Sequence, residues 1–255
     1  MLRSLLALPQ TRGLLLDSPG TTRVRRQIIQ SKPFLRRVYE QWYRHIVADV
    51  PSGPGAVVEL GAGAGFLHGF IEDLITSDVL AVEDLSVQFD AHDLPFQTAC
   101  LRAIVMTNVL HHVPQPRRFF TAATRCVRPG GAIVMIEPWV SPWSRFVYQG
   151  LHHEPFEPEA AAWEFPRSGP LSGANGAGPW IVFHRDRARF EREFPSWRIE
   201  RVRPLMPFSY LLSGGVSMRT LMPGWGFGAC RALERVLEPW MRWMAMFAQV
   251  TLVRR

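Results

Sequence analysis

A glycine-rich loop follows the first apolar run of the chain and is a candidate ligand site. The run Ala56–Leu60 leads into a Gly-x-Gly-x-Gly loop that ends at Gly65. Glycine has no Cβ, so a ligand can approach this backbone closely and the chain can turn sharply. A dinucleotide-binding loop needs Gly or Ala three residues after its second glycine, where this chain has Phe66 or His68. No Gly-Lys-Ser/Thr follows either, which excludes a phosphate-binding P-loop.

An acidic residue stands at the end of the next expected strand. Asp78 closes that strand, and a carboxylate there can accept the hydrogens of both hydroxyls of a ribose. Glu83 and Asp84 are alternative candidates for this role. The other interpretation of Asp78 is a structural aspartate in a turn.

Polar residues also follow the fourth apolar run, 101–107. They are Asn108, His111 and His112. The carboxyl ends of the strands in an open α/β sheet line the crevice that binds the ligand, so these side chains are candidates to contact it. The alternative for either imidazole is that it caps or packs against the next helix.

His152, His153 and Glu154 form a further titratable cluster. An imidazole that is oriented by a carboxylate can remove the proton of a substrate hydroxyl, so these residues are the candidate catalytic group. Adjacent side chains point in different directions on most backbones, so one of the two histidines would serve. Metal binding by the pair is a weaker alternative, and we predict no metal site.

Alternating strand and helix patterns surround these candidates and indicate an α/β fold. Such strands, joined by right-handed crossovers, form a doubly wound, mostly parallel sheet covered on both faces. The expected strands are 56–60, a second ending at 74–78, 85–90, 101–107, 132–137, 197–202 and 245–253. The expected helices are 31–49, 66–74, 117–127 and 230–243, with a turn at 128–131.

The regular pattern is interrupted once and preceded by a helical segment. Residues 1–50 are predicted to form an N-terminal helical cap, and residues 51–255 a single domain with a seven-stranded sheet. An irregular insertion, rich in Pro, Gly, Trp and Phe, is expected at about 139–195 between the fifth and sixth strands.

The combination of these motifs resembles the class I S-adenosylmethionine-dependent methyltransferases, and within them the methyltransferase type 11 family. The motifs are Glu59 with the glycine loop, Asp78, the Asp-Ala-x-x-Leu-Pro-Phe segment that begins at Asp90, and the Leu-His-His segment at 110–112. The resemblance covers 55–138 well, is weak in the last strands, and does not extend to the insertion. One departure is 97–101, where Gln-Thr-Ala-Cys-Leu replaces an acidic segment, which suggests a tighter apolar entry to the fourth strand.

The resemblance implies a Rossmann-like methyltransferase fold and S-adenosylmethionine as cofactor. It implies that the glycine loop surrounds the methionine part, that Asp78 binds the ribose, and that Asp90 binds the adenine amino group. Asn108 and one histidine are implied to contact the amino-acid end. The implied cofactor residues are Glu59, Gly61, Ala62, Gly63, Gly65, Phe66, Asp78, Asp90, Ala91, Asn108 and His112.

The acceptor is expected to be small and apolar, aromatic or lipid-like, with O-methylation favoured. Helix 31–49 and the insertion should cover the ligand edge of the sheet, and aromatic side chains there suit such an acceptor. The alternative is that they form a small core of their own. The insertion carries Trp139, Trp143, Tyr148, Phe156, Trp163, Phe165, Trp180 and Phe183.

The apolar segment 204–225 suggests peripheral contact with a membrane and a lipid-linked acceptor. A lid or a dimer contact is the alternative. No apolar run is long enough for a membrane-spanning helix, and the three cysteines are too widely spaced for a disulfide framework. We therefore predict a cytoplasmic protein, with peripheral contact to a membrane as a further expectation.

The net charge of +7 raises the question of a nucleic-acid partner. Lys32 is the single lysine among 29 basic residues, which indicates a general bias toward arginine rather than a nucleic-acid surface. RNA methylation rests on charge alone, and no Asn/Asp-Pro-Pro-aromatic motif occurs. The sequence thus predicts a methyltransferase acting on a small or lipid-linked molecule. The alternative is a catalytically silent cofactor-binding partner or regulator of another enzyme.

Overall fold

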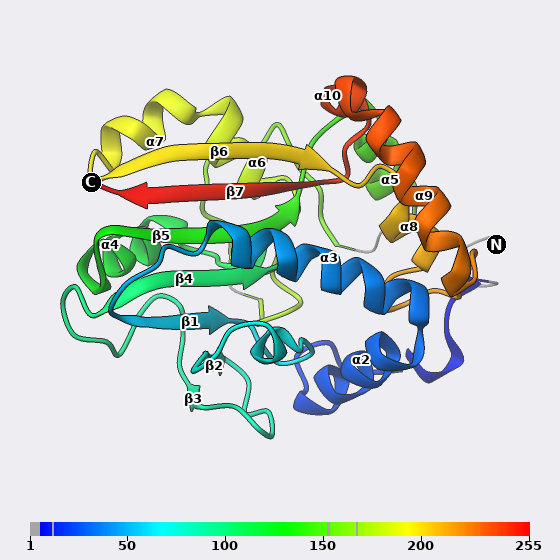
Figure 1. Cartoon of the computed structure of the whole chain (residues 1–255), viewed down its shortest axis with the longest axis horizontal. Helices are drawn as coiled ribbons and strands as arrows, with labels where there is room; N and C mark the ends of the chain where they lie inside the picture. Colours follow the sequence, from blue (N-terminus) through cyan, green and yellow to red (C-terminus); the bar gives the residue numbers. More distant parts are fainter. Residues whose placement is uncertain (1–5, 12, 152–153, 167) are drawn as a thin grey trace.

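The computed structural model describes residues 6–11, 13–151, 154–166 and 168–255, and a seven-stranded sheet forms its centre (Figure 1). The strand order is β3-β2-β1-β4-β5-β7-β6, and the pairings are parallel except for β7, which is antiparallel to both neighbours. This order confirms the predicted doubly wound, mostly parallel fold. The strands are β1 Ala56–Leu60, β2 Ile75–Asp78, β3 Val87–Gln88, β4 Leu101–Thr107, β5 Val127–Pro138, β6 Trp197–Leu205 and β7 Phe247–Arg254.

Helices cover both faces of the sheet. In Figure 1, α3 crosses the near face, whereas α4 and α7 lie behind the sheet. The α-helices are α2 Pro19–Ser31, α3 Pro33–Asp49, α4 Pro116–Cys126, α5 Pro142–Leu151, α6 Gly178–Trp180, α7 Arg187–Glu193, α8 Ser209–Ser213, α9 Phe227–Val236 and α10 Met241–Met244. Short 3-10 helices are η1 Pro9–Thr11, η2 Leu67–Gly69, η3 Leu110–His112, η5 Gly224–Gly226 and η6 Glu238–Trp240, and η4 Ile181–Arg185 is a π-helix.

Two of the expected elements are wrong. The helix expected at 66–74 is only the short η2, because glycines flank it and Asp73 takes a left-handed φ of 56° that no helix continues. The turn expected at 128–131 is the start of β5, where Gly130 has a φ of 74° and the register with β4 shifts. The insertion is also more regular than expected, since it contains α5, α6, η4 and α7.

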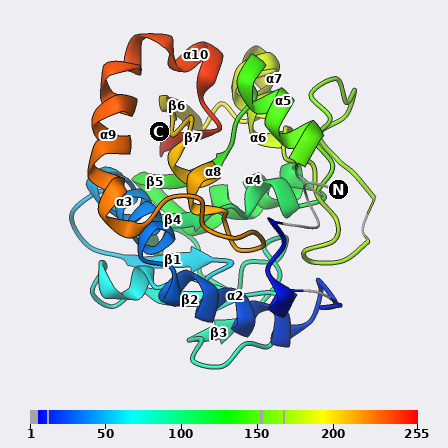
Figure 2. The same ribbon diagram turned by 90° about the vertical axis from the view of Figure 1, so that its right-hand side faces the viewer.

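The carboxyl ends of β1, β4 and β5 meet at one edge of the sheet, which faces the viewer in Figure 2. Elements distant in sequence, α2 and α8, lie near this edge. Helix α3 shares the core of the sheet through Phe34, Trp42 and Ile46, so the cap that we predicted at 1–50 packs on the domain. Its separation as a unit of its own stays a prediction. Among the described residues, no helix is both long and apolar enough to cross a membrane.

Asp49, the last residue of α3, ties that helix to β6 and β7. Its carboxylate accepts hydrogen bonds from Thr251 Oγ1 at 2.6 Å, Gln249 Nε2 at 2.8 Å and Arg201 Nη1 at 2.5 Å. Thr251 and Gln249 are buried, so their donors need this partner.

Replacing Asp49 by Ala should therefore lower the free energy of unfolding by about 2–3 kcal/mol, because a charged acceptor is removed from buried donors. Urea unfolding measures this. The exposed Glu72→Ala is the control and should change the value by less than about 0.5 kcal/mol. Equal stability of the two variants would mean that α3 is held by its apolar face alone.

Candidate functional site

The glycine loop after β1 is packed too tightly for any other residue at Gly61. This residue has a φ of 65°, and a Cβ on it would lie 2.5 Å from Val109 Cγ2. Gly61 therefore lets the loop lie directly against the residues that follow β4. The close packing brings the ends of β1 and β4 together at the edge where ligands bind in such sheets.

Most of the loop supports the site from behind rather than facing it. The amides of Ala62, Gly63 and Phe66 donate to Ser77 O, Asp78 Oδ2 and Tyr43 Oη at 2.9, 3.2 and 3.1 Å. The Phe66 ring packs against Tyr43, with centroids 4.9 Å apart. Direct cofactor contact, which the resemblance implied for several loop residues, stays a prediction. Glu59, Ala62, Gly63, Gly65 and Phe66 are not among the described residues that line the cavities below.

Helix α2 covers the loop; it lies within the predicted helical cap at 1–50, although its own bounds were not predicted. Arg26 donates from Nε and Nη2 to Gly63 O at 3.1 and 2.8 Å. Arg23 pairs with Glu83 at 2.5 Å, and Arg26 with Asp84 at 3.4 Å, both on the exposed outer side of the loop. The two acidic residues that rivalled Asp78 are therefore engaged outside the site.

Two cavities lie at this edge of the sheet and share part of their walls. The β3-side cavity has a volume of about 390 Å³ and is lined by Ser77, Val79 and the segment 89–92. The β5-side cavity has a volume of about 190 Å³ and is lined by residues of α5, α8 and the segment 214–218. Both cavities are lined by Gly61, Asp78, Asn108, His112 and Leu171. The two cavities are therefore neighbours at the carboxyl ends of the strands.

Asp78 lies where the cavities meet, as its predicted role requires. Its carboxylate accepts from Leu80 N at 2.9 Å and from Gly63 N at 3.2 Å. Burial raises the pKa of Asp78, and these backbone donors oppose the rise. The carboxylate is held in place by the backbone and faces the shared wall.

Asp90 is fixed in the β3-side cavity by a chain of hydrogen bonds. The amide of Gln115 donates to His92 Nε2 at 3.2 Å, so the ring proton of a neutral His92 lies on Nδ1. His92 Nδ1 then donates to Asp90 Oδ1 at 2.5 Å. This chain orients the carboxylate that the sequence assigned to the adenine amino group, and Ala91 lines the same cavity.

Two polar atoms at the end of β4 are buried without a hydrogen-bond partner among the described residues. They are Thr107 Oγ1 and Asn108 Oδ1, and both residues line the β5-side cavity. Asn108 has a left-handed φ of 57°, which is strained for a residue other than glycine. Orphaned polar atoms at a cavity wall are what a polar ligand group would satisfy.

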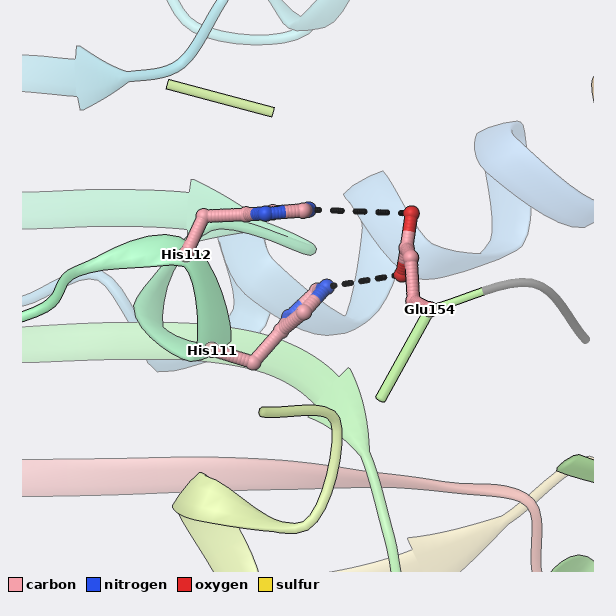
Figure 3. A group of neighbouring side chains, drawn as sticks. All are labelled: His111, His112 and Glu154. Atoms are coloured by element: carbon pink, nitrogen blue, oxygen red, sulfur yellow. Dashed lines mark ion pairs between the residues drawn. The ribbon is translucent and has the colours of Figure 1, made fainter. Parts of the chain in front are cut away.

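Two histidines and two carboxylates form a buried cluster at the same edge of the sheet, and Figure 3 shows three of them, His111, His112 and Glu154. His111 Nδ1 donates to Glu137 Oε2 at 2.7 Å, and His111 Nε2 lies 3.7 Å from Glu154 Oε2. His112 Nδ1 donates to the carbonyl of Gly173 at 3.1 Å, and His112 Nε2 lies 4.0 Å from Glu154 Oε1. Both imidazoles thus point toward one carboxylate.

Burial and neighbouring charges shift the pKa values of the two rings in opposite directions. Burial lowers the pKa of His111, but the hydrogen bonds and charges of Glu137 and Glu154 outweigh it and raise the pKa to about 9. Burial, together with the charge of His111, lowers the pKa of His112 to about 3. The sequence analysis missed Glu137, whose one signal is a charged residue ending an apolar strand.

Of the predicted catalytic group, the structure describes only Glu154. His152 and His153 lie outside the described residues, whereas Glu154 lines the β5-side cavity. Tyr148 and Phe156 line this cavity too, but Trp163 packs against Phe190 instead, so the insertion aromatics do not all face an acceptor. Part of the wall comes from residues 210–211 and 214–218, which belong to the segment 204–225 that we interpreted as a membrane contact, a lid or a dimer contact.

One family model matches part of the chain. Residues 58–135 match the model of the methyltransferase domain family, Methyltransf_11. No curated protein sequence matches the chain significantly.

Solved structures with weak likeness include several methyltransferases. One is the geranyl diphosphate C-methyltransferase of Streptomyces coelicolor in complex with Mg²⁺, geranyl diphosphate and S-adenosylhomocysteine (12% identity over 87% of this chain and 81% of that chain, TM-score 0.46). Another is an S-adenosylmethionine-dependent methyltransferase of Mesorhizobium loti (16% identity, 83% and 96% covered, TM-score 0.48). A third is a Haloferax volcanii complex with the Trm112 methyltransferase activator (13% identity, 84% and 89% covered, TM-score 0.48). Nothing about the substrate of this chain follows from likenesses of this strength.

The domain match confirms the predicted class. Residues 58–135 are the core of an S-adenosylmethionine-dependent methyltransferase domain, and S-adenosylmethionine is the cofactor of that domain. The residues present fit this cofactor, because the carboxylate of Asp78 and the orphaned oxygen of Asn108 belong to residues that line both cavities.

Glu59 behind the loop makes stability depend on pH. Burial, together with the charge of Asp78, raises the pKa of Glu59 to about 8, far above its value of about 4.3 in an unfolded chain. Between about pH 4.3 and about pH 8 the folded protein therefore binds more protons than the unfolded chain. The free energy of unfolding therefore falls as the pH rises toward 8.

From pH 5 to 8, the free energy of unfolding of the wild type should fall relative to that of Glu59→Gln, by up to about 1.4 kcal/mol per pH unit. Thermal or urea unfolding of both proteins across this range measures the difference. Parallel pH profiles for the two proteins would show that Glu59 is ionised in the folded state throughout.

Proposed function

We propose that this protein transfers a methyl group from S-adenosylmethionine to a hydroxyl of a small, apolar acceptor. The observation that carries the proposal is the pair of cavities that share Gly61, Asp78, Asn108 and His112. A donor in the β3-side cavity and an acceptor in the β5-side cavity would meet at this wall. Such positioning can supply much of the rate of a bimolecular displacement.

The cofactor would lie along the β3-side cavity. Asp90 and Ala91 would bind its adenine, Asp78 its ribose, and the orphaned oxygen of Asn108 its amino-acid end. When bound, the cofactor supplies a methyl group on a positively charged sulfur. The residues of this chain would hold it in register with the acceptor and exclude water.

The β5-side cavity supports an apolar acceptor with one polar end. Val147, Phe156, Met246 and Phe247 line it, and the hydroxyl of Tyr148 donates to Met246 O at 2.9 Å. The histidine and carboxylate cluster lies at one end, where an acceptor hydroxyl would be oriented. His152 or His153, paired with Glu154, remains our candidate base for removing the hydroxyl proton.

A lipid-like acceptor is supported by apolar side chains outside this cavity. Trp225 is 83% exposed and Val236 69%, and Leu233, Trp240 and Trp243 are also exposed. Leu233 and Val236 lie about one turn apart on α9, and Trp240 follows in η6. Arg235 and Arg242 are also exposed. We propose that this stripe (Trp225, Leu233, Val236, Trp240 and Trp243) rests on an anionic lipid surface.

Binding of S-adenosylhomocysteine tests the donor site by isothermal titration. Asp78→Ala should weaken binding at least about tenfold, because a charged hydrogen-bond partner is lost. Gly63→Val should do the same, since a Cβ at Gly63 would lie 2.7 Å from Asp78 Oδ2 and would displace this carboxylate. Glu83→Ala, the exposed rival, is the control and should keep the affinity of the wild type. Normal affinity in both Asp78→Ala and Gly63→Val would contradict the assigned site.

Transfer of label from methyl-labelled S-adenosylmethionine tests the acceptor class. We expect label on an alkyl-substituted phenol, because its ring suits the apolar wall and its hydroxyl the polar end, and none on free amino acids or RNA. With the phenol embedded in anionic vesicles, the Trp225→Ser/Trp243→Ser double variant should lose rate severalfold, while its rate on the dissolved phenol stays unchanged. Label on amino acids or RNA alone would contradict the acceptor class. No label on anything, with the cofactor bound, would indicate a silent binding partner.

A further inference from the structure

The buried histidine cluster has the hydrogen-bond pattern of metal ligands. In metal sites, a ligating imidazole almost always donates its other ring N–H to a carboxylate, a carbonyl or a water. His111 donates Nδ1–H to Glu137, and His112 donates Nδ1–H to the carbonyl of Gly173. Both Nε2 atoms are thereby fixed as the atoms that face Glu154, as Figure 3 shows.

The spacing of the three groups fits one small cation. One ligand atom from each of His111, His112 and Glu154 lies within 4.8 Å of the others. A cation with bonds of about 2.1 Å holds its ligands roughly 3–3.6 Å apart. His111 Nε2 lies 3.7 Å from Glu154 Oε2 and His112 Nε2 lies 4.0 Å from Glu154 Oε1, so these two distances exceed the range by a few tenths of an ångström. The full set of three atoms, within 4.8 Å of one another, would have to draw together around the ion.

The outer partners of the cluster are rigid. Glu137 is fully buried, and its Oε1 accepts from the amides of Val109 and Leu110 at 2.8 and 2.7 Å. Its other oxygen is thus held in place to orient His111. A site whose second layer is already in place binds metal with little rearrangement.

We propose that His111 Nε2, His112 Nε2 and the Glu154 carboxylate bind a divalent first-row transition metal ion at the wall of the β5-side cavity. Two imidazoles and one carboxylate suit zinc or iron(II), whereas magnesium prefers oxygen ligands alone. Three protein ligands leave coordination positions open. All three residues line the β5-side cavity, so an open position faces it.

The open position defines a class of ligand. A metal ion there would take an oxygen of the acceptor, such as a hydroxyl, phenol or carboxylate, and would hold it at the polar end of the apolar cavity. This role rests on the proposed function, whereas the metal site itself does not. The competing explanation of the same geometry is that a proton on His111 alone links the two carboxylates.

Isothermal titration with Zn²⁺ alone, on the full chain freed of metal by a chelator, tests the site. We expect one Zn²⁺ per chain with a dissociation constant in the micromolar range or tighter, and no binding of Mg²⁺ at the same concentration. Glu154→Gln and His112→Gln keep the size of the side chains and should each weaken Zn²⁺ binding at least about tenfold. Visible absorption of bound Co²⁺ gives a second readout that a purely structural role would not move.

Two variants separate this site from other histidines. His68→Ala removes an exposed histidine, and His152→Ala/His153→Ala removes the adjacent pair outside the described residues. Both should keep the affinity of the wild type for Zn²⁺. Loss of binding in the double variant, with normal binding by His112→Gln, would overturn the proposal.

Absence of Zn²⁺ and Co²⁺ binding by the wild type would also overturn it. If that protein still binds S-adenosylhomocysteine, the proposed function survives the failure of the metal site. The reverse result, with Zn²⁺ bound at these residues and no S-adenosylhomocysteine binding, would support the metal site and remove the proposed function.

Discussion

Glu137 is a fully buried carboxylate at the carboxyl end of β5, and the arrangement of the site depends on satisfying it. A buried carboxylate without partners is very unfavourable. Here it accepts two backbone amides and one imidazole from the segment after β4. These bonds fix η3 against the end of β5. The wall between the two cavities is therefore a consequence of one electrostatic requirement.

The remaining parts of the wall depend on the same packing. Asn108 takes a left-handed conformation directly before η3, and Val109 fills the space that Gly61 leaves. The glycine loop, in turn, positions Asp78 through the amide of Gly63. Side chains from β1, β2 and β4 are thus brought to one place by backbone contacts. This agrees with a reaction that needs accurate positioning of the two reactants more than it needs a general acid or base.

The sequence was sufficient for the parts that depend on local patterns. β1 and β4 were predicted because buried parallel strands are continuous apolar runs, and Asp78 was predicted from its place after such a run. The bounds of α2 within the predicted helical cap were missed because its residues show no clear apolar stripe. The pairing of Glu154 with His111 and His112 was also missed. It arises from packing between segments more than forty residues apart, which no local pattern encodes.

The central claim is that the donor and the acceptor meet at the wall formed by Gly61, Asp78, Asn108 and His112. The most direct measurement is a crystal structure of the protein with S-adenosylhomocysteine. The account predicts the adenine beside Asp90 and Ala91, the ribose hydroxyls on Asp78, and the sulfur facing the β5-side cavity. A cofactor bound elsewhere, or with its sulfur turned away from that cavity, would contradict the account.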